Sequence, residues 1–456
     1  MKKVSSIILA AGKGSRFGSK LPKIRHTVGG LPLFCHVIKS CMDAGAKDTV
    51  LVISSELSGV LDKVPLSCTG GASVKTAVQP IPLGTGDAVL HGFKQCSKAS
   101  EWVVILYADT PLIRPKTIQS MLQAADSKTG VVVLAMKPDE DTGYAKLVAG
   151  PDEALFAIVE EKDTVSYNLR DGCRFLSLCN AGMLIKQEVA EQFLDKLPSS
   201  PITEETYITN IVELAREAGW TCHYVVGNAE ELRGVNTRAD LAAVEKSFQE
   251  RMRRAALDNC VGLTAPETVH FSYDTIVEPD ATIHPFVTFG PGAIIRSGSE
   301  IRSFCVIENA EVKQGAIVGP FARIRPGSAI QEGAHIGNFV EVKKSTVGVG
   351  AKINHLSYIG DASIGDEVNI GAGTITCNYD GFKKHQTTIG NKASIGANSS
   401  LVAPVNIGAR AILGAGSVIT EDVPEDALAL ERAPQVTLKG KAEKIRAKRT
   451  GFMEQS

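Results

Sequence analysis

Aliphatic residues recur every six positions through the C-terminal part of the chain. Glycine often follows the aliphatic position, as at Gly337, Gly371 and Gly396. An α-helix repeats its apolar face about every 3.6 residues and a simple strand every second residue, so neither produces this period. A six-residue unit is typical of one short strand plus a turn, and three such units form a triangular coil. The pattern therefore predicts a parallel β-helix over residues 265–425, with about nine coils.

The same spacing predicts the core of this β-helix. We expect each aliphatic residue of a six-residue series to point into its coil and pack against its equivalents above and below. The first series comprises Ile294, Val306, Val312, Val318, Ile324, Ile330, Ile336 and Val342. Later series comprise Val347, Ile353 and Ile359, then Ile364 and Ile370, then Ile389, Ile395, Leu401, Ile407, Leu413 and Ile419.

The first 235 residues follow a different pattern. Short apolar runs at residues 5–10, 49–54, 102–107 and 130–136 alternate with stretches of helical periodicity. Such runs are typical of buried strands in an open, mostly parallel α/β sheet. Between the two halves, residues 237–257 predict one long amphipathic helix that acts as a spacer.

Composition narrows the class of protein. The chain has 456 residues, 44% of them hydrophobic, which is enough for two or three domains. No apolar run approaches the roughly 18 residues of a membrane span, and residues 1–16 fit a buried strand better than a signal peptide. Ten cysteines without CxxC spacing indicate reduced thiols in the cytoplasm. A net charge of −1 argues against nucleic acid or membrane partners, and we expect the basic tail after Lys439 to be solvated and disordered.

Candidate chemistry begins directly after the first predicted strand. Residues 10–16 are mostly small, and small residues let backbone N–H groups approach phosphate oxygens. Lys13, Arg16 and Lys23 would neutralise a triphosphate bound there. The loop lacks the GxxxxGK[ST] pattern and misses GxGxxG by one residue. Its form, LxxGxGxRxxxxxPK, resembles the signature of the sugar-nucleotide pyrophosphorylases.

An acidic residue, Asp109, lies just past the predicted strand over residues 102–107. Ligands of α/β sheets collect at this carboxyl edge, and Mg²⁺ is usually held there by one or two carboxylates together with phosphate oxygens. Asp109 is therefore a candidate metal ligand, with capping of the following turn as the alternative. Asn236 follows another short hydrophobic run and adds a candidate neutral oxygen, with a turn or helix-cap role as its alternative.

The repeat spacing by itself brings two cations together on the β-helix. Arg325 and Lys343 each follow a series member by one residue and lie one full coil apart. They should stack on one wall, roughly 5 Å apart along the axis. Because like charges on adjacent coils repel, a bound dianion would stabilise the pair. This favours a sugar-phosphate clamp over surface decoration.

With these motifs, the whole chain resembles the bacterial bifunctional N-acetylglucosamine-1-phosphate uridyltransferase/glucosamine-1-phosphate N-acetyltransferase family. The resemblance implies a Rossmann-like α/β nucleotidyltransferase domain over residues 1–235 and a linker helix over 236–257. Residues 258–456 would form a left-handed parallel β-helix acetyltransferase domain with a C-terminal tail. It also implies Mg²⁺ as cofactor and a homotrimer built through the β-helix.

The resemblance implies two reactions in sequence. Acetyl-CoA acetylates glucosamine 1-phosphate at the β-helix, and the product then reacts with UTP in the α/β domain. Pyrophosphate leaves, and UDP-N-acetylglucosamine results as a precursor of peptidoglycan and lipopolysaccharide.

The resemblance also assigns residues of the nucleotidyltransferase site. Asp109 and Asn236 match the Mg²⁺ ligands, and Arg16 and Lys23 match cations that compensate charge during catalysis. The positions that match contacts to UTP or the nucleotide sugar are Leu9, Ala10, Ala11, Gly12, Lys23, Gln79, Gly84, Thr85, Tyr107, Ala108, Asp109, Ala145, Glu160, Asn180 and Asn236. Three positions depart from the usual family pattern, with Pro82 in place of Gln and with Ala108 and Ala145 in place of Gly.

In the β-helix, the resemblance assigns His355 as the general base that takes a proton from the attacking amine. A lone histidine is more often structural, but imidazole has a pKa suited to this step. Glucosamine 1-phosphate contacts match Arg325, Lys343, Tyr358 and Asn369. Between Thr374 and Thr388 the six-residue pattern breaks for a loop, and such insertions in a solenoid are usually functional. Acetyl-CoA contacts match Ala372, Asn378, Tyr379, Lys384, Ala397, Ala415 and Arg432, with Ala397 in place of the usual Ser.

Two alternative interpretations keep the fold and change the function. A one-site pyrophosphorylase would use its β-helix only for regulation or assembly, but the Arg325–Lys343 pair and the segment around His355 argue against it. A non-catalytic scaffold would have lost its cations and its acid, yet Arg16, Lys23 and Asp109 are all present. The sequence therefore predicts an enzyme with two active sites.

Overall fold

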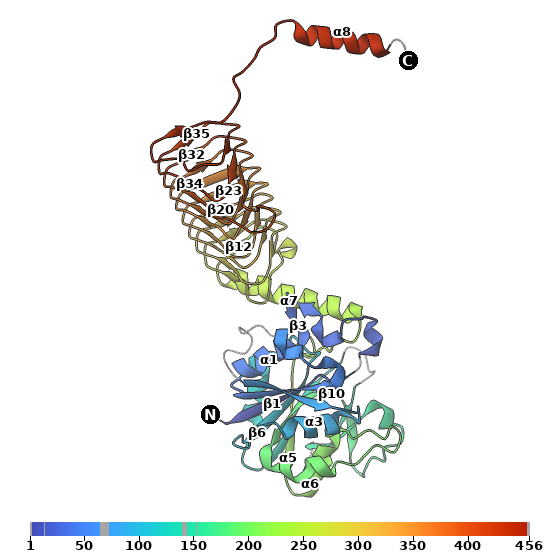
Figure 1. Cartoon of the computed structure of the whole chain (residues 1–456). Helices are drawn as coiled ribbons and strands as arrows, with labels where there is room; N and C mark the ends of the chain where they lie inside the picture. Colours follow the sequence, from blue (N-terminus) through green and yellow to red (C-terminus); the bar gives the residue numbers. More distant parts are fainter. Residues whose placement is uncertain (1, 13, 64–72, 139–143, 152, 454–456) are drawn as a thin grey trace. The chain divides into compact units, whose positions relative to one another are not determined.

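The computed structural model describes residues 2–12, 14–63, 73–138, 144–151 and 153–453. The chain divides into two compact units, Met1–Met252 and Arg253–Ser456 (Figure 1). The first unit combines helices with a sheet, and the second is built almost entirely of short strands. The fold class agrees with the prediction, an α/β sheet followed by a left-handed parallel β-helix.

The first unit is built around a mixed, mostly parallel sheet. From one edge to the other its main strands are β11 (Thr221–Val226), β7 (Thr129–Met136), β10 (Arg174–Lys186), β6 (Trp102–Tyr107), β1 (Val4–Leu9), β4 (Asp48–Ser54) and β5 (Ser73–Gln79). β10 runs antiparallel to β6 and β7, and the other neighbours pair in parallel. The hairpin of β8 (Lys146–Ala149) and β9 (Leu155–Val159) extends the sheet from β10. The four predicted apolar runs are the strands β1, β4, β6 and β7.

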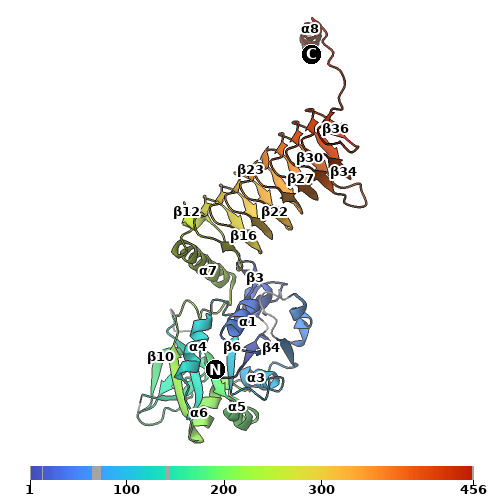
Figure 2. The ribbon, with the colours of Figure 1, turned by 90° about the vertical axis from the view of Figure 1, so that its left-hand side faces the viewer.

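Helices cover both faces of this sheet (Figure 2). One face carries Ile7, Val103 and Ile105, which share a cluster of buried side chains with α3 (Thr85–Phe93), α5 (Gln187–Phe193) and α6 (Ile211–Glu217). The helices α1 (Leu33–Asp43) and α4 (Pro115–Ala124) pack together on the opposite face. Because both faces are covered, the strands are apolar throughout, which explains their continuous apolar runs.

The long helix predicted over residues 237–257 is α7 (Arg238–Asp258). Phe248 of this helix packs edge-on against the ring of His36, with centroids 5.7 Å apart. Its ring also fills the space beside Gly29. A Cβ added to this glycine would lie only 2.3 Å from a ring carbon of Phe248. Glu245 accepts a hydrogen bond from the Gly29 N–H at 2.8 Å. Up to Met252, α7 is therefore part of the first unit.

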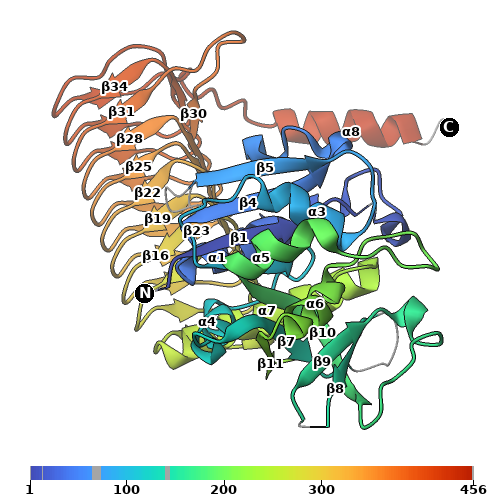
Figure 3. The same ribbon diagram turned by 90° about the horizontal axis from the view of Figure 1, so that it is seen from below.

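The second unit is a triangular parallel β-helix whose strands stack coil on coil (Figure 3). In the described part of the chain, the first wall has ten strands, from β12 (Gly262–Leu263) to β37 (Leu428–Ala429). The second wall has eight described strands, from β13 (Ile276–Val277) to β34 (Val405–Ile407), and the third has eight, from β15 (Thr288–Phe289) to β36 (Val418–Ile419). All neighbours within a wall pair in parallel, so each coil lies about 4.8 Å above the last.

The predicted core positions are confirmed over most of the β-helix. From Val312 to Ile419, every member of the predicted series is buried. The prediction is wrong for two earlier members, because Val306 is 41% exposed and Ile294 is only partly buried. Their neighbours Ile307 and Ile295 point inward instead. The pairing of Ile295 with Val312 shows the cause, a coil one residue shorter than the regular period at that point.

At several positions glycine follows the inward aliphatic residue because the next coil leaves no room there for a Cβ. At Gly337 a Cβ would lie 1.9 Å from the carbonyl oxygen of Asn354. At Gly371 and Gly396 it would lie 2.5 and 2.4 Å from the backbone nitrogens of the coil above. These glycines are therefore required by the close approach of the two backbones.

After the last coil the chain continues into α8 (Lys441–Met453). The side chains of residues 430–448 are exposed, as expected for a solvated tail. The expectation of disorder was wrong, because Ala, Lys, Glu and Arg all favour helix. Of the helices that the structure describes, none is both long and apolar enough to cross a membrane.

Gly396→Ala tests the close approach between coils. The added methyl group would meet the Ala415 nitrogen at 2.4 Å, so the two coils must separate. We expect the local unfolding free energy of residues 389–419 to fall by about 1–3 kcal/mol, measured by amide hydrogen exchange. Thr388→Ala, at an exposed position nearby, is the control and should change it by less than about 0.5 kcal/mol. Equal protection in both variants would contradict the steric explanation.

Candidate active sites

The first unit has a pocket at the carboxyl edge of its parallel strands, with a volume of about 280 Å³. β1, β5 and β6 end at this pocket, through Leu9, Gln79 and Tyr107. Every predicted nucleotide contact from Leu9 to Asp109 lines it, although these residues are spread over a hundred positions of sequence. The sheet brings them together because the carboxyl ends of its parallel strands meet at one edge.

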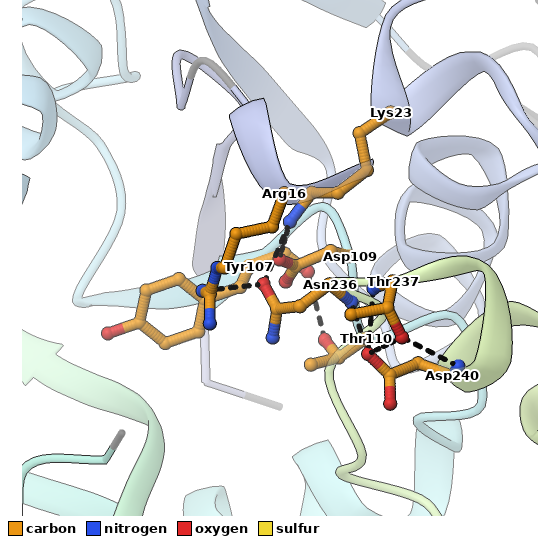
Figure 4. A network of polar contacts seen from close by, with 8 residues as sticks. All are labelled: Arg16, Lys23, Tyr107, Asp109, Thr110, Asn236, Thr237 and Asp240. Carbon is orange, nitrogen blue, oxygen red and sulfur yellow. Dashed lines mark hydrogen bonds and ion pairs between the residues drawn. The ribbon is translucent and has the colours of Figure 1, made fainter. Parts of the chain in front are cut away.

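Lys23 lies between the two candidate metal ligands at this edge (Figure 4). Its Nζ donates to Asp109 Oδ2 at 2.5 Å and to Asn236 Oδ1 at 3.3 Å. Arg16 Nη2 donates to the same Asn236 oxygen at 3.3 Å. The side chains of Lys23 and Asp109 are only 13% and 23% exposed, so water screens their attraction less than at the surface. Lys13, the third predicted cation, lies outside the described residues.

Two distant parts of the chain hold this cluster in place. The N–H of Val235 donates to the carbonyl oxygen of Asp109 at 2.9 Å, which brings Asn236 beside the end of β6. Asp240 Oδ2 then accepts from the N–H groups of Asn236 and Thr237, at 2.9 and 2.8 Å. Burial opposes ionisation of Asp240, but these hydrogen bonds outweigh it and lower the pKa of the carboxyl group. Asp240 thus caps the start of α7 and leaves the side-chain oxygen of Asn236 free to face Lys23.

The donor set of this cluster fits a divalent cation. The Lys23 ammonium already lies where the oxygens of Asp109 and Asn236 converge, so that point favours positive charge. Carboxylate and amide oxygens are hard ligands of the kind that Mg²⁺ takes, and the ion completes its shell with water and phosphate oxygens. In the described residues, no group of three or more His, Cys, Asp or Glu side chains could hold a metal by itself. The site therefore suits a cation that arrives with a phosphate ligand.

A second polar group lies next to Asp109, where the predicted sugar contacts meet. Asn180 Nδ2 donates to Tyr107 Oη at 3.3 Å, and the Asn180 N–H donates to the Ala145 carbonyl oxygen at 2.9 Å. Thr209 Oγ1 donates to Glu160 Oε1 at 2.9 Å. Burial raises the pKa of Tyr107, and the negative charge of Glu160 adds to that shift. Burial likewise raises the pKa of Glu160.

The loop around Gly84 is fastened by a segment that lies 120 positions further along the chain. Gly84 has φ of 105°, and a Cβ there would lie 2.4 Å from the carbonyl oxygen of Thr206. The Thr206 N–H donates to the Leu83 carbonyl oxygen at 2.8 Å, and the Gly86 N–H donates to the Thr206 carbonyl oxygen at 2.7 Å. The glycine is therefore needed for this close crossing of two backbones.

The same segment adds two pocket residues that the sequence analysis missed. Glu205 and Tyr207 line the pocket, and the Tyr207 hydroxyl donates to Glu205 Oε2 at 2.7 Å. Burial raises the pKa of Tyr207 to about 12. The sequence around them shows no motif or periodicity that marks a binding site, so only the folded chain reveals them.

On the β-helix, Arg325 and Lys343 stack one coil apart, as their spacing predicted. Ile324 pairs with Val342, so the two cations that follow them share the third wall. Arg325 Nη1 donates to Glu341 Oε1 at 2.8 Å, so a carboxylate partly balances the pair. Lys384 reaches Lys343 from the inserted loop, and this neighbouring ammonium lowers the pKa of Lys384. Arg325 is thus paired with a carboxylate, and Lys343 with a second ammonium group on its wall.

His355 lies on the edge between the first and third walls, which we call the His355 edge. It ends β26 (Lys352–His355) and pairs with Asn338 of the coil below. His355 Nδ1 lies 2.8 Å from the amide oxygen of Asn338, which can only accept. Nδ1 therefore carries a proton, so in the neutral ring the lone pair lies on Nε2. The regular period does not predict the contact with Asn338, because this coil is one residue shorter than that period.

Three of the predicted coenzyme residues stack above His355 on the same edge. Ala372, Ala397 and Ala415 hold equivalent places in the next three coils. The carbonyl oxygens of His355, Ala372 and Ala397 each accept an N–H from the coil above, at 3.3, 2.7 and 2.8 Å. Arg432 Nη1 donates to the Ala415 carbonyl oxygen at 3.0 Å. The stack extends about 14 Å from His355 at one strand spacing per coil.

The loop predicted from the break in the repeat is confirmed between Cys377 and Thr387. Asn378 Nδ2 donates to Asp361 Oδ2 at 2.5 Å and lies 3.5 Å from Tyr358 Oη. Tyr379 is 61% exposed at the tip. Tyr358, Asn378 and Lys384 are thus brought together around Asp361, which the sequence analysis had not singled out.

Asn369 lies on the first wall, as does His355. It pairs with Lys352, three residues before His355, so it is one coil above the start of β26. The structure therefore places it at the opposite end of the first wall's strands from His355, and the described residues show no contact between the two side chains.

Comparison with known proteins agrees with this architecture. Residues 6–164 match the MobA-like NTP transferase domain, and residues 386–421 match the bacterial transferase hexapeptide (six repeats). The chain is 45% identical to a bifunctional protein GlmU of Paramagnetospirillum magneticum, over 98% of this chain and 97% of that protein. It is 44% identical to the bifunctional protein GlmU of Paracoccus denitrificans and 42% identical to that of a Bradyrhizobium species, in both cases over 97% of each chain. The chain therefore belongs to the family of bifunctional GlmU proteins, in which a uridylyltransferase and an acetyltransferase share one polypeptide.

Proposed function

We propose that this chain makes UDP-N-acetylglucosamine in two steps at the two sites described above. Acetyl-CoA acetylates glucosamine 1-phosphate on the β-helix, and the product reacts with UTP in the first unit. The observation that carries the proposal is the meeting of Lys23, Arg16, Asp109 and Asn236 at the mouth of the pocket. That cluster suits a triphosphate with its metal, and a separate cluster of cations on the β-helix suits a sugar phosphate.

Uridylyl transfer needs positioning and charge compensation more than a strong base. The phosphate of N-acetylglucosamine 1-phosphate attacks the α-phosphorus of UTP, the bond to the β-phosphate breaks, and pyrophosphate leaves. Asp109 and Asn236 would hold Mg²⁺, which neutralises phosphate charge. Lys23 and Arg16 stabilise charge that develops on the phosphate oxygens. Glu160, Asn180 and Tyr107 would bind the sugar.

The base of UTP would lie against Gln79, Gly84 and Thr85, with Leu9 to Gly12 beneath the ribose and phosphates. These residues line one continuous pocket. Ala108 and Ala145, which depart from the usual glycine, are both buried. The Ala145 side chain packs in the apolar cluster of the first unit, whereas Ala108 lines the pocket.

Acetyl transfer needs a base at the amine. The amine of glucosamine 1-phosphate attacks the thioester carbonyl of acetyl-CoA while His355 Nε2 takes the amine proton. The C–S bond then breaks, and the leaving thiolate of coenzyme A takes up a proton. Arg325, Lys343 and Lys384 would hold the phosphate, with Tyr358 and Asn369 on the sugar. The stack of Ala372, Ala397 and Ala415 up to Arg432, with Asn378 and Tyr379, would bind the coenzyme.

A homotrimer is also part of this proposal, and it is supported by an exposed apolar stripe. Phe286, Phe304, Phe321 and Phe339, which we call the Phe ladder, stack on the His355 edge with ring centroids 4.7–5.3 Å apart. Leu356 extends the ladder beside His355, and all five side chains are 47–61% exposed. A contiguous exposed apolar stripe of this kind is typical of an interface between protein chains. Copies of this chain that associate along the ladder would cover it and place a neighbouring subunit beside His355.

We place the enzyme in the cytoplasm, where acetyl-CoA and UTP are available. Cys41 and Cys222 are buried free thiols, which suits a reducing compartment.

Two substitutions should separate the two activities. Asp109→Ala should slow pyrophosphate release from UTP by about 10²–10³-fold, because charge compensation is lost, and leave acetyl transfer unchanged. His355→Ala should slow release of free thiol from acetyl-CoA by about 10²–10⁴-fold. Both products are measured after incubation with glucosamine 1-phosphate, N-acetylglucosamine 1-phosphate and MgCl₂. Wild-type protein that releases thiol alone, pyrophosphate alone or neither would contradict the two-site function.

Glu160→Gln should stabilise the folded protein and weaken binding of the sugar phosphate. The pKa of Glu160 is raised in the folded protein, so the charged form is disfavoured and stability is lost as pH rises through that pKa. The variant should therefore unfold at a higher temperature than wild type at pH 7.5, and this gain should shrink as the pH is lowered. We expect its KM for N-acetylglucosamine 1-phosphate to rise about tenfold.

Glu161→Gln, at the exposed neighbouring position, is the matched control. It should change neither the unfolding temperature nor the KM for N-acetylglucosamine 1-phosphate. A Glu160→Gln variant with unchanged KM would exclude this carboxylate from sugar binding.

Substitution within the Phe ladder tests the trimer. Phe304→Asp combined with Phe321→Asp introduces charge into the stripe, so subunits should dissociate and acetyl transfer should fall at least tenfold. Uridylyl transfer should continue. Light scattering coupled to size-exclusion chromatography gives the mass of wild type and variant. Ile276→Asp, 50% exposed on the second wall away from this edge, is the control, and a double variant that stays trimeric would rule out the ladder as the interface.

A further inference from the structure

Gln79 presents one end of its amide to the nucleotide pocket, and a second residue decides which end that is. The side chain is 5% exposed and lies at the end of β5, in the pocket wall. Its Nε2 donates to the carbonyl oxygen of Gly84 at 3.0 Å and to Asp87 Oδ2 at 2.7 Å. A carbonyl oxygen and a carboxylate only accept hydrogen bonds, so only the NH₂ group of Gln79 can face them. The amide oxygen therefore points away from both acceptors, and because Gln79 lines the pocket it is the end available to a ligand there.

The two acceptors are themselves fixed. Asp87 lies in the first turn of α3, where the helix dipole favours a negative charge. His91, one turn further on, places its Nε2 3.7 Å from the other carboxylate oxygen. Gly84 is held by the close crossing with Thr206. Neither acceptor can turn away without breaking these contacts, so the orientation of the amide is built into the fold.

We propose that Asp87 is a positioning residue that makes the pocket selective for uracil over cytosine. The inference rests on the proposed function, in which the base lies against Gln79. Uracil carries a hydrogen on N3 and can donate it to the Gln79 oxygen. Cytosine has a lone pair on N3, which would face that oxygen and leave two acceptors opposed. The carboxylate thus sets base selectivity without touching the base.

The isosteric substitution Asp87→Asn would remove the charged one of the two acceptors and leave the Gly84 carbonyl. The new amide can turn either its oxygen or its NH₂ group toward Gln79, so a Gln79 amide rotated by about 180° would be opposed by the Gly84 carbonyl alone and could offer a donor to N3 of cytosine. We expect kcat/KM with UTP to fall about tenfold and the ratio of kcat/KM for UTP to that for CTP to fall at least tenfold. Asp87→Ala, which also frees the amide, should lower the same ratio.

The test uses the full-length protein with N-acetylglucosamine 1-phosphate, MgCl₂ and either UTP or CTP, and measures release of pyrophosphate. Asp43→Asn, an exposed aspartate on α1 paired with Lys39, is the matched control and should keep the wild-type ratio. Acetyl transfer, measured on the same samples, should stay unchanged in all variants.

The outcomes separate the two proposals. If both Asp87 variants lower the rates with UTP and CTP equally, or leave both unchanged, the positioning role is wrong. If wild-type protein releases no pyrophosphate from either nucleotide, uridylyl transfer itself is refuted. A lowered ratio in both Asp87 variants, with the Asp43 control unchanged, supports the inference.

Discussion

The stacking of coils at one strand spacing is the constraint from which most of the second unit follows. Backbone hydrogen bonds between successive coils hold each residue about 4.8 Å above its equivalent. At Gly337, Gly371 and Gly396 the backbone of the next coil comes so close that a Cβ would not fit. Because of this spacing, side chains at equivalent positions of successive coils form columns. Phenyl rings become the Phe ladder, and three alanines become a stack that leads away from His355.

This geometry suits the proposed acetyl transfer. A coenzyme with a long pantetheine arm needs an extended, rigid surface, and a column of small side chains along one edge provides one. His355 lies between the apolar Phe ladder on one side and the alanine stack on the other. Its partner Asn338 comes from the coil below, so the hydrogen bond that sets the proton on Nδ1 is itself a contact between coils.

In the first unit, the fold brings charged and polar side chains together at one point. β1 and β6 end side by side, and the segment before α7 crosses the end of β6. Lys23, Asp109 and Asn236 therefore meet, although more than 200 positions of sequence separate Lys23 from Asn236. The Lys23 ammonium balances the carboxylate, and Arg16 adds a second positive charge beside Asn236. An incoming phosphate with its metal would find both signs of charge already in place, so little reorganisation is needed.

Much of the fold and of the candidate sites could be predicted from the sequence alone, because the interactions that determine them are local or periodic. The six-residue period determined the β-helix and most of its core, and the spacing of Arg325 and Lys343 determined their stacking. The loop from Leu9 to Lys23 and the position of Asp109 after a buried strand determined where the first site lies. Tertiary structure decided the rest. Coils of irregular length set which of two adjacent aliphatic residues points inward at Ile294 and Val306, and they brought Asn338 to His355. The crossing at Thr206 brought Glu205 and Tyr207 to the pocket, and the turn into α3 placed Asp87 against Gln79. These contacts join segments with no shared period, so only the packed backbone determines which side chains meet.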